Sequence, residues 1–360
     1  MMQKLSPRYS GRRICIDAGI GFMTGKMNEF ELIRMLTAQR GIHRKDVLLG
    51  VGDDAAVVDA NGKCLLFTCD AQIDGTHYLR ERISPYILGQ RIAAVNLSDI
   101  AAMGGEPLWA LCSLVVDSGA DAGYFDELYR GLYDELGRFS VQLIGGNVAR
   151  TDASAVTDLF LVGQAEKEEV LYRSGARVGD LLCVTGTLGD SAAGLKLLMD
   201  GPGFSDRYAP LVHAHQRPVP RIEVGRVLSG TSGVTACMDI SDGLLQDAMH
   251  LADASGIHLN IDDTEMPLHP LTIEYASASG QDAVVLALSG GEDYELLFTV
   301  NGKAYPELAR RIDEETGVPV TVIGEVVPPR GNGMPVQPRS DRYRALLHRG
   351  FDHLHPDKLS

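Results

Sequence analysis

Residues 236–247 read ACMDISDGLLQD, and this stretch decides the fold class. A short apolar run ends at Asp239, a turn containing a glycine follows, and a helical pattern begins near residue 243. Apolar segments of strand length, such as residues 108–116, alternate with helical patterns along the rest of the chain. Strands interleaved with helices predict an α/β or α+β protein.

The expected elements follow from apolar periodicity and from turn and capping residues. Strands are predicted at residues 47–51, 55–58, 64–68, 108–116, 141–144, 159–162, 181–184, 284–288 and 295–300. Helices are predicted from Asn28 with its capping partner Glu31, from Ser84-Pro85, and near 125–136, 191–199, 243–254 and 304–315. Trp109 and Cys112 lie in an apolar strand and are expected in the core. Gly145-Gly146 is expected to separate the strands at 141–144 and 159–162.

The length of 360 residues predicts about two domains. An acidic run at residues 166–169 and the pair Ser174-Gly175 interrupt the pattern and mark a boundary. We expect a disordered extension at 1–26, an N-terminal domain at 27–165 and a C-terminal α/β domain at 166–360.

The composition limits the partners. The chain carries 33 Lys+Arg against 48 Asp+Glu, a formal charge of -15. Such a surface repels nucleic acids and anionic membranes, so neither is expected as a partner, and a polyanionic ligand would need cations as intermediaries. No run of about 18 apolar residues is present, so no membrane span is predicted.

The six cysteines favour a reduced, cytoplasmic protein. Cys15, Cys64, Cys69, Cys112, Cys183 and Cys237 lie far apart and form no C-x-x-C pair. Their spacing predicts neither a zinc site nor a disulfide framework. The N-terminal residues show no apolar core typical of a secretory signal.

Acidic residues beside glycines or small polar residues end several predicted strands. They are Asp53, Asp54, Asp70, Asp99, Asp239, Asp242, Glu292 and Asp293. A single such aspartate is usually a turn or cap residue, but five such segments in one chain favour a shared role. Carboxylates hold Mg²⁺ beside substrate phosphates, so the set predicts several Mg²⁺ ions around a triphosphate. Neither a P-loop nor a G-x-G-x-x-G after a strand is present, which excludes the common phosphate cradles.

Five motifs occur along the chain in a fixed order: NLSDIAAMG (96–104), SGARVGD (174–180), VTGTLGDSAAGL (184–195), DISDGL (239–244) and SGGEDYELLF (289–298). In this order they resemble the thiamine-monophosphate kinase family, which belongs to the superfamily of aminoimidazole ribonucleotide synthetase. The resemblance runs from about Asn28 to GFDH at 350–353. It implies a two-domain fold of that superfamily: an N-terminal mixed sheet or half-barrel that forms a homodimer, and a C-terminal α/β sandwich.

The resemblance also implies the activity: ATP phosphorylates thiamine monophosphate by direct in-line transfer, with Mg²⁺ and without a covalent intermediate. The implied metal ligands are Asp54, Thr68, Cys69, Asp70, Asp99, Asn147, Asp239 and Asp242. The implied nucleotide contacts are Gly146, Arg173 and Ser241, and the implied thiamine phosphate contacts are His77, Glu292 and Phe351.

Three of these positions depart from the family pattern. Asn147 replaces an aspartate after Gly145-Gly146, which removes a charge from one cation site. Cys69 replaces a hydroxyl residue, and a thiol is a poor Mg²⁺ ligand. Phe351 replaces an expected tyrosine, which keeps the aromatic face but loses a hydrogen bond.

Two alternatives remain open from the sequence. One is another ATP-using synthetase of the superfamily, although the chain shows no N-terminal cysteine nucleophile motif and no C-terminal cysteine carrier. The other is a non-catalytic nucleotide or metal sensor, which Asn147 and Cys69 would favour. Arg173 has the alternative of pairing with the acidic run at 166–169, and His213 and His215 are more typical of a surface loop than of a metal site.

Overall fold

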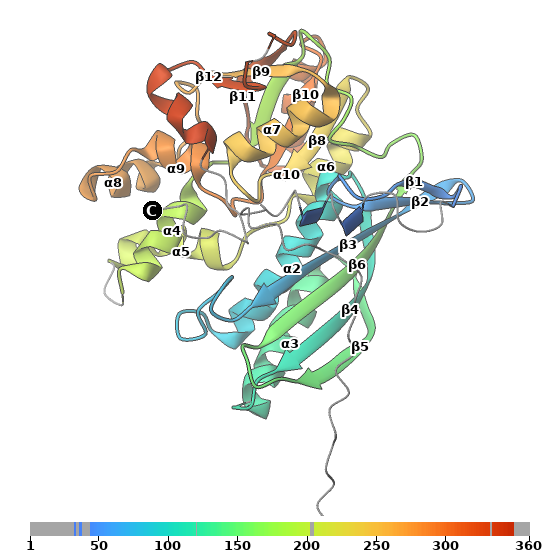
Figure 1. Cartoon of the computed structure of the whole chain (residues 1–360), viewed down its shortest axis with the longest axis vertical. Coiled ribbons are helices and arrows are strands. Elements are labelled where there is room, and N and C mark those ends of the chain that lie inside the picture. The colour runs from blue at the N-terminus through green and yellow to red at the C-terminus, as the bar shows by residue number, and fades with distance from the viewer. Residues whose placement is uncertain are drawn as a thin grey trace, which may run out of the picture.

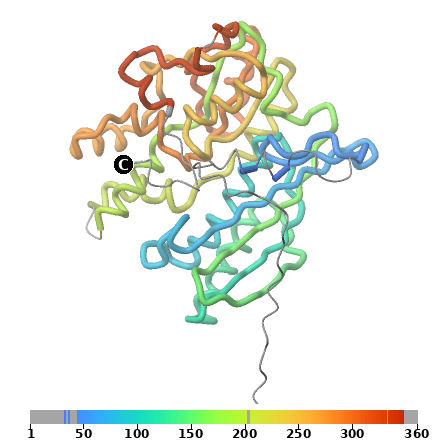
Figure 2. Tube along the Cα trace, in the orientation of Figure 1, coloured from blue at the N-terminus to red at the C-terminus, as the bar shows by residue number. Residues whose placement is uncertain are grey.

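The structure is a computed structural model that describes residues 32–33, 36–37, 44–119, 121–201, 205–331 and 333–348. Two mixed sheets, one from each half of the sequence, form the framework (Figure 1). The tube in Figure 2 shows the blue-to-green first half below and the yellow-to-red second half above. This arrangement confirms the predicted class, a two-part α/β protein with mixed sheets.

The first sheet has the strand order β1-β2-β3-β6-β4-β5. Its strands are β1 (Val47–Leu49), β2 (Ala56–Ala60), β3 (Lys63–Ile73), β4 (Glu106–Val116), β5 (Gln142–Arg150) and β6 (Val156–Glu166). Only β4 and β5 pair in parallel. Strand β2 pairs with β3 only as far as Phe67, so no strand among the described residues pairs with the second half of β3 on that side.

Helices α2 (Pro85–Ala102) and α3 (Ala122–Arg138) cover one face of this sheet (Figure 1). Helix α2 begins where predicted, because the Ser84 side chain accepts a hydrogen bond from the backbone N–H of Ile87 and a proline occupies the first turn. No described helix covers the opposite face. Trp109 is therefore 42% exposed there, which corrects its predicted core position, whereas Cys112 on the helical side is buried as expected.

The second sheet has the strand order β12-β9-β11-β7-β10-β8. Its strands are β7 (Leu181–Thr185), β8 (Val234–Asp239), β9 (His258–Ile261), β10 (Leu296–Val300), β11 (Val320–Val327) and β12 (Val336–Pro338). The helices of this half are α4 (Asp190–Met199), α5 (Ala209–Gln216), α6 (Ile222–Ser229), α7 (Leu244–Ser255), α8 (Pro270–Ala278), α9 (Ala283–Ser289) and α10 (Tyr305–Thr316), with short 3₁₀ segments η1 (Asp206–Tyr208) and η2 (Asp341–His348).

Two predictions of secondary structure are wrong. Residues 284–288 form helix α9 instead of a strand, because Asp282 caps the segment by accepting a hydrogen bond from the N–H of Val284 at 2.9 Å. A short apolar run does not distinguish the two states by periodicity alone. Gly145-Gly146 continues β5 instead of separating strands: a Cβ at Gly146 would lie 1.9 Å from the carbonyl oxygen of Cys112, so glycine permits the close pairing with β4.

Other predictions fall on residues that are not described. The extension at 1–26 lies outside the described residues, and so does most of the helix predicted from Asn28. Of that helix, residues 32–33 and 36–37 are described and are helical. Within the described residues, no helix is both long and apolar enough to span a bilayer.

Candidate functional site

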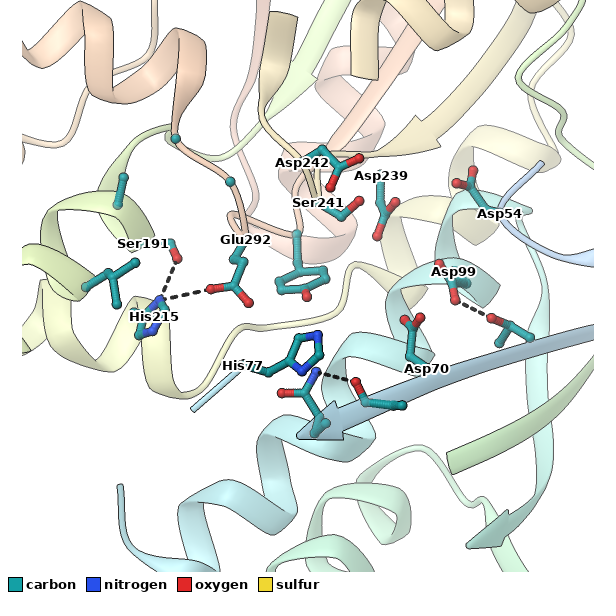
Figure 3. A pocket seen from close by; sticks show the side chains of 18 of the residues that line it. Asp54, Asp70, His77, Asp99, Ser191, His215, Asp239, Ser241, Asp242 and Glu292 are labelled. Carbon is teal, nitrogen blue, oxygen red and sulfur yellow. Dashed lines mark hydrogen bonds and ion pairs between the residues drawn. The ribbon is translucent and has the colours of Figure 1, made fainter. Parts of the chain in front are cut away.

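A cleft of about 1360 Å³ lies between the two halves. Its walls come from the loop before β2, the second half of β3, helix α2, the β8–α7 loop, helices α4 and α9, and the segment before β10. The side chains fall into two groups: aspartates at one end, and His77, His215 and Glu292 at the other (Figure 3). The cleft thus has an anionic end and an end of mixed charge.

Three aspartates from distant parts of the chain meet at the anionic end. Asp54, Asp99 and Asp239 each place a carboxylate oxygen within 4.8 Å of the others. Asp54 lies in the loop before β2, Asp99 on helix α2 and Asp239 at the end of β8. Asp70 and Asp242 line the same cleft.

The positions of two of these aspartates correct the prediction that all of them end strands. Asp99 lies inside helix α2, and Asp70 lies inside strand β3, which extends to Ile73. Asp70 still reaches the cleft because its side chain lies on the same face of β3 as Thr68, the face toward helix α2. Asp99 reaches it because α2 passes between the two sheets (Figure 1).

Hydroxyl groups orient two of the carboxylates. Thr68 Oγ1 donates a hydrogen bond to Asp99, and Ser98 Oγ donates to Asp239 Oδ2 at 2.6 Å. Burial, together with the negative charge of Asp54, raises the pKa of Asp239 to about 7. Burial and the neighbouring carboxylates also raise the pKa of Asp99 well above its ordinary value. The raised pKa values indicate that these carboxylates repel one another, so a bound cation would favour their ionised forms.

The donor set fits a hard divalent cation. All the converging atoms are oxygens, and Asp54 Oδ2 is buried without a hydrogen-bond partner among the described residues. An orphaned buried carboxylate oxygen costs free energy unless something else satisfies it. Mg²⁺ prefers carboxylate oxygens and phosphate oxygens as ligands.

Arg173 closes the anionic end. Its Nε donates to Asp54 Oδ1 at 3.1 Å, and its backbone N–H donates to the carboxylate of Asp53. Arg173 therefore pairs with these aspartates and not with the acidic run at residues 166–169. Burial and the charge of Asp54 raise the pKa of Asp53 to about 6. Ser255 holds the Arg173 segment by donating to its carbonyl oxygen at 3.1 Å.

The other end of the cleft is organised around Glu292. Its backbone has φ 66°, a left-handed conformation that is uncommon outside glycine. Its carboxylate forms an ion pair with Arg91, a residue of α2 that is 1% exposed, and lies 3.3 Å from His215 Nδ1. Burial opposes ionisation, but Arg91 and His215 outweigh it and the pKa of Glu292 is lowered. Glu292 is thus an anion at the cleft wall.

Two histidines flank Glu292. His77 Nδ1 accepts a hydrogen bond from the backbone N–H of Ile73 at 3.0 Å, which fixes the ring at the cleft wall. His215 is buried in helix α5, which corrects the predicted surface loop, and burial lowers its pKa to about 4. Ser191 Oγ and Glu292 both contact Nδ1 of His215, so the three do not form a nucleophile–base–acid relay, which needs both ring nitrogens.

Four of the predicted site residues differ from the others in their chemistry or in their position relative to the cleft. The Cys69 thiol donates to Asp158 at 3.0 Å, and burial with that contact raises its pKa to about 12, so its side chain is a poor metal ligand. Gly146 and Asn147 lie in edge strand β5, away from the residues that line the cleft of this chain. Phe351 lies outside the described residues.

Sequence reasoning missed Arg91, His215, Asp247 and Tyr294. Arg91 is the one charged residue in the segment 87–95, which was a usable signal, because a buried charge in such a helix needs a partner. Nothing local distinguished His215 from a surface histidine. Tyr294, which also has a positive φ of 51°, lines the cleft through a loop shape that the sequence did not predict.

The raised pKa of Asp239 predicts a pH-dependent response to Mg²⁺. The pKa of Asp239 in the folded protein is about 7, above the ordinary 3.8. Protonation of Asp239 therefore stabilises the metal-free fold. This contribution is complete below about pH 4 and is lost as the pH rises through 7. A cation needs the ionised carboxylates and competes with protons. We expect the increase in Tm produced by MgCl₂ to be larger at about pH 8 than at about pH 5.5. An equal or smaller increase at the higher pH would contradict this.

Both halves of the chain match models of one protein family. The family model described as "AIR synthase related protein, N-terminal domain" matches residues 52–165, and the corresponding C-terminal domain model matches residues 177–336. Two such domains, with mixed sheets, make this chain an AIR synthase related protein.

More specific relatives are also evident. The chain is 37% identical over 285 residues to the thiamine-monophosphate kinase of Aquifex aeolicus, covering 78% of this chain and 91% of that protein. It is 35% identical to the thiamine-monophosphate kinase of Haemophilus influenzae, covering 92% and 99%. The solved structure "AaThiL complexed with AMPPCP and TMP" superposes with a TM-score of 0.81 at 32% identity, covering 93% and 100%. The chain belongs to the thiamine-monophosphate kinase family.

Proposed function

We propose that this protein transfers the γ-phosphoryl group of ATP to thiamine monophosphate and so forms thiamine diphosphate. The observation that carries the proposal is one cleft that joins a carboxylate cluster to an anionic wall at Glu292. The similarity to "AaThiL complexed with AMPPCP and TMP", an ATP analogue and the acceptor, supports it. The bond between the γ-phosphorus and the β-γ bridging oxygen breaks, and a bond forms to an oxygen of the acceptor phosphate.

The acceptor chemistry explains why the site lacks an activated nucleophile. A phosphate monoester is already anionic near neutral pH, so its oxygen attacks without first losing a proton to a base. The Cys69 thiol, with a raised pKa, and His215, which is buried and neutral, are unsuited to covalent catalysis. What remains is positioning and charge neutralisation, which dominate phosphoryl transfer.

Mg²⁺ ions are part of the proposal. Asp54, Asp99 and Asp239 would hold them, with Asp70 and Asp242 beside them and Thr68 orienting Asp99. Bound Mg²⁺ neutralises the phosphate charges that two anionic substrates bring together. Arg173 and Ser241 line the same end and are proposed to contact the nucleotide.

Glu292 and His77 are proposed to face the acceptor. Thiamine monophosphate carries a cationic thiazolium ring and an aminopyrimidine ring, which suit a carboxylate and a hydrogen-bonding imidazole. Arg91 keeps Glu292 ionised and His215 helps to fix its position, although both contacts also occupy part of the carboxylate. The sequence resemblance adds Phe351 to this group as a prediction.

A Glu292→Gln variant is expected to raise the KM for thiamine monophosphate by about 10- to 100-fold, because a charge-assisted contact contributes roughly 1.5–3 kcal/mol. The KM for ATP should change little, since the carboxylate cluster is untouched. Steady-state kinetics with each substrate varied in turn measures both. A matched Glu265→Gln variant, at an exposed position, serves as the control. Equal changes in both KM values would remove Glu292 from the acceptor site.

The proposal includes a homodimer. Trp109 and Leu111 lie 42% and 39% exposed on the uncovered face of the first sheet, beside Phe67 and Phe160, whose rings stack at 6.0 Å. A contiguous apolar face of this kind favours association. Asn147 pairs with Ser113 on the same face, so a second copy seated there would lie against Asn147.

The proposed compartment is the cytoplasm, where ATP is available and the free thiols stay reduced.

Placing a charge on this face tests the dimer. Leu111→Asp is expected to convert the dimer into a monomer, because the aspartate would have to be buried without a partner. Light scattering coupled to size-exclusion chromatography measures the mass. Ile273→Asp, at an exposed apolar position on α8, should leave the dimer intact. A monomeric wild-type protein would contradict the proposal.

The activity is tested by mixing the protein with ATP, MgCl₂ and thiamine monophosphate and separating the products. Formation of thiamine diphosphate supports the kinase. ATP consumption that requires an amidine or selenide acceptor would favour another synthetase of the superfamily. Nucleotide binding without turnover would favour a sensor.

A further inference from the structure

The loop that follows β8 is held by a buried carboxylate that the mechanism does not use. Asp247 Oδ2 accepts hydrogen bonds from three successive backbone N–H groups, those of Ser241, Asp242 and Gly243, at 3.0, 3.1 and 3.0 Å. Asp247 is 1% exposed and lies in the first turns of α7. Helical side chains lean toward the N-terminus, so Asp247 points back into this loop.

Successive N–H groups that converge on one point form an anion-binding concavity, and helix N-termini commonly bind phosphate in this way. Here the acceptor is a carboxyl oxygen of the chain itself, Asp247 Oδ2. The N-terminus of α7 is therefore already occupied, and it does not offer these donors to a substrate phosphate. Positive charge for a substrate phosphate must therefore come from elsewhere in the cleft, from Arg173 or from cations that the carboxylate cluster would hold.

The loop held by Asp247 connects both ends of the cleft. Gln246 Nε2 donates to Asp242 Oδ2 at 2.9 Å, so α7 fixes both the backbone and the side chain of Asp242. On the other side, the N–H of Glu292 donates to the carbonyl oxygen of Ser241 at 2.7 Å. Gly243 has φ 115° and a Cβ there would lie 3.1 Å from the Gly290 carbonyl oxygen, so the two loops pack backbone to backbone.

We propose that Asp247 is a positioning residue: by filling the N–H concavity of residues 241–243, it holds Asp242 in the orientation that binds the divalent cation. This inference rests on the metal site of the proposed function. Outer residues that orient metal ligands typically change metal affinity about 10- to 100-fold when they are replaced. A role limited to stability would lower Tm and leave the metal affinity of the folded protein unchanged.

The test measures Mn²⁺ binding by electron paramagnetic resonance, in the presence of AMPPCP, for wild type, Asp247→Ala, Asp247→Asn and the control Asp253→Asn. Asp253 lies exposed on the same helix. We expect Asp247→Ala to weaken Mn²⁺ binding by about 10- to 100-fold. Asp247→Asn, which keeps an acceptor oxygen but loses the charge, should lose less, and Asp253→Asn should match wild type.

Each possible result either supports or overturns the positioning role of Asp247. Wild-type affinity in a folded Asp247→Ala protein overturns the inference and leaves the metal site standing. If the alanine variant fails to fold, Asp247→Asn decides: weaker binding in the folded protein supports the inference, and unchanged binding overturns it. A wild-type protein that binds no Mn²⁺ overturns the metal site and the inference together.

Discussion

An Asp99→Asn variant is expected to lose about 10³-fold in kcat while the metal-free protein becomes no less stable. A metal ion contributes several kcal/mol of charge stabilisation, and about 1.4 kcal/mol corresponds to a factor of ten in rate. The substitution keeps an oxygen that can accept from Thr68 but removes one charge from a crowded cluster. Relief of repulsion should therefore maintain or raise the Tm measured without metal.

Kinetics and thermal unfolding of the same preparations test this prediction. Asp126→Asn, an exposed aspartate on α3, is the matched control and should change neither quantity. If Asp99→Asn lowers the Tm of the metal-free protein by several degrees, the carboxylate is a structural group. Near-normal turnover would remove Asp99 from the metal site.

An Arg173→Met variant is expected to lose about 3–5 kcal/mol of unfolding free energy in the absence of metal, as is typical when one partner of a buried ion pair is removed. The carboxylate of Asp54 is fully buried, and Asp53 beside it is nearly so. Without the guanidinium, these carboxylates repel each other and must take up protons or a cation. Added MgCl₂ should therefore stabilise the variant more than it stabilises wild type.

Urea unfolding with and without MgCl₂ measures both effects. Arg177→Met, four residues further along and exposed, controls for the loss of a positive charge from this segment. A loss below about 1 kcal/mol, the range of surface ion pairs, would show that Arg173 does not neutralise the buried aspartates. An identical response of variant and wild type to MgCl₂ would show that no cation binds beside them.

Most helices and strands could be predicted from the sequence, because caps and apolar periodicity are local signals. Ser84-Pro85 predicted the start of α2, and the apolar run at 108–116 predicted β4. The segment 284–288 suits both a strand and a helix in length and composition, and the cap that Asp282 provides selects the helix. Trp109 lies in an apolar strand of the kind that is typical of a core. It is exposed because no described element covers its face of the sheet, which the sequence of the strand alone does not indicate.

The site was predictable only in part. Turn chemistry pointed to Asp239, and the repetition of acidic segments pointed to its companions. Arg91 and His215 were not found because their importance arises from contacts with Glu292, which lies about 200 and 77 positions away in sequence and is brought close only by the fold. Gly146 and Asn147 remain predictions that this single chain does not support, because they occupy an edge strand away from the cleft.

The central claim is that the cleft joins ATP to a phosphate acceptor, and tracing the transferred group tests it most directly. The protein is incubated with MgCl₂, thiamine monophosphate and ATP labelled with ³²P in the γ-phosphate, and the label is followed by chromatography. The account predicts label in thiamine diphosphate in equal amount to the ADP formed, with little label in free phosphate. Label found only in free phosphate, or no release of ADP, would contradict it.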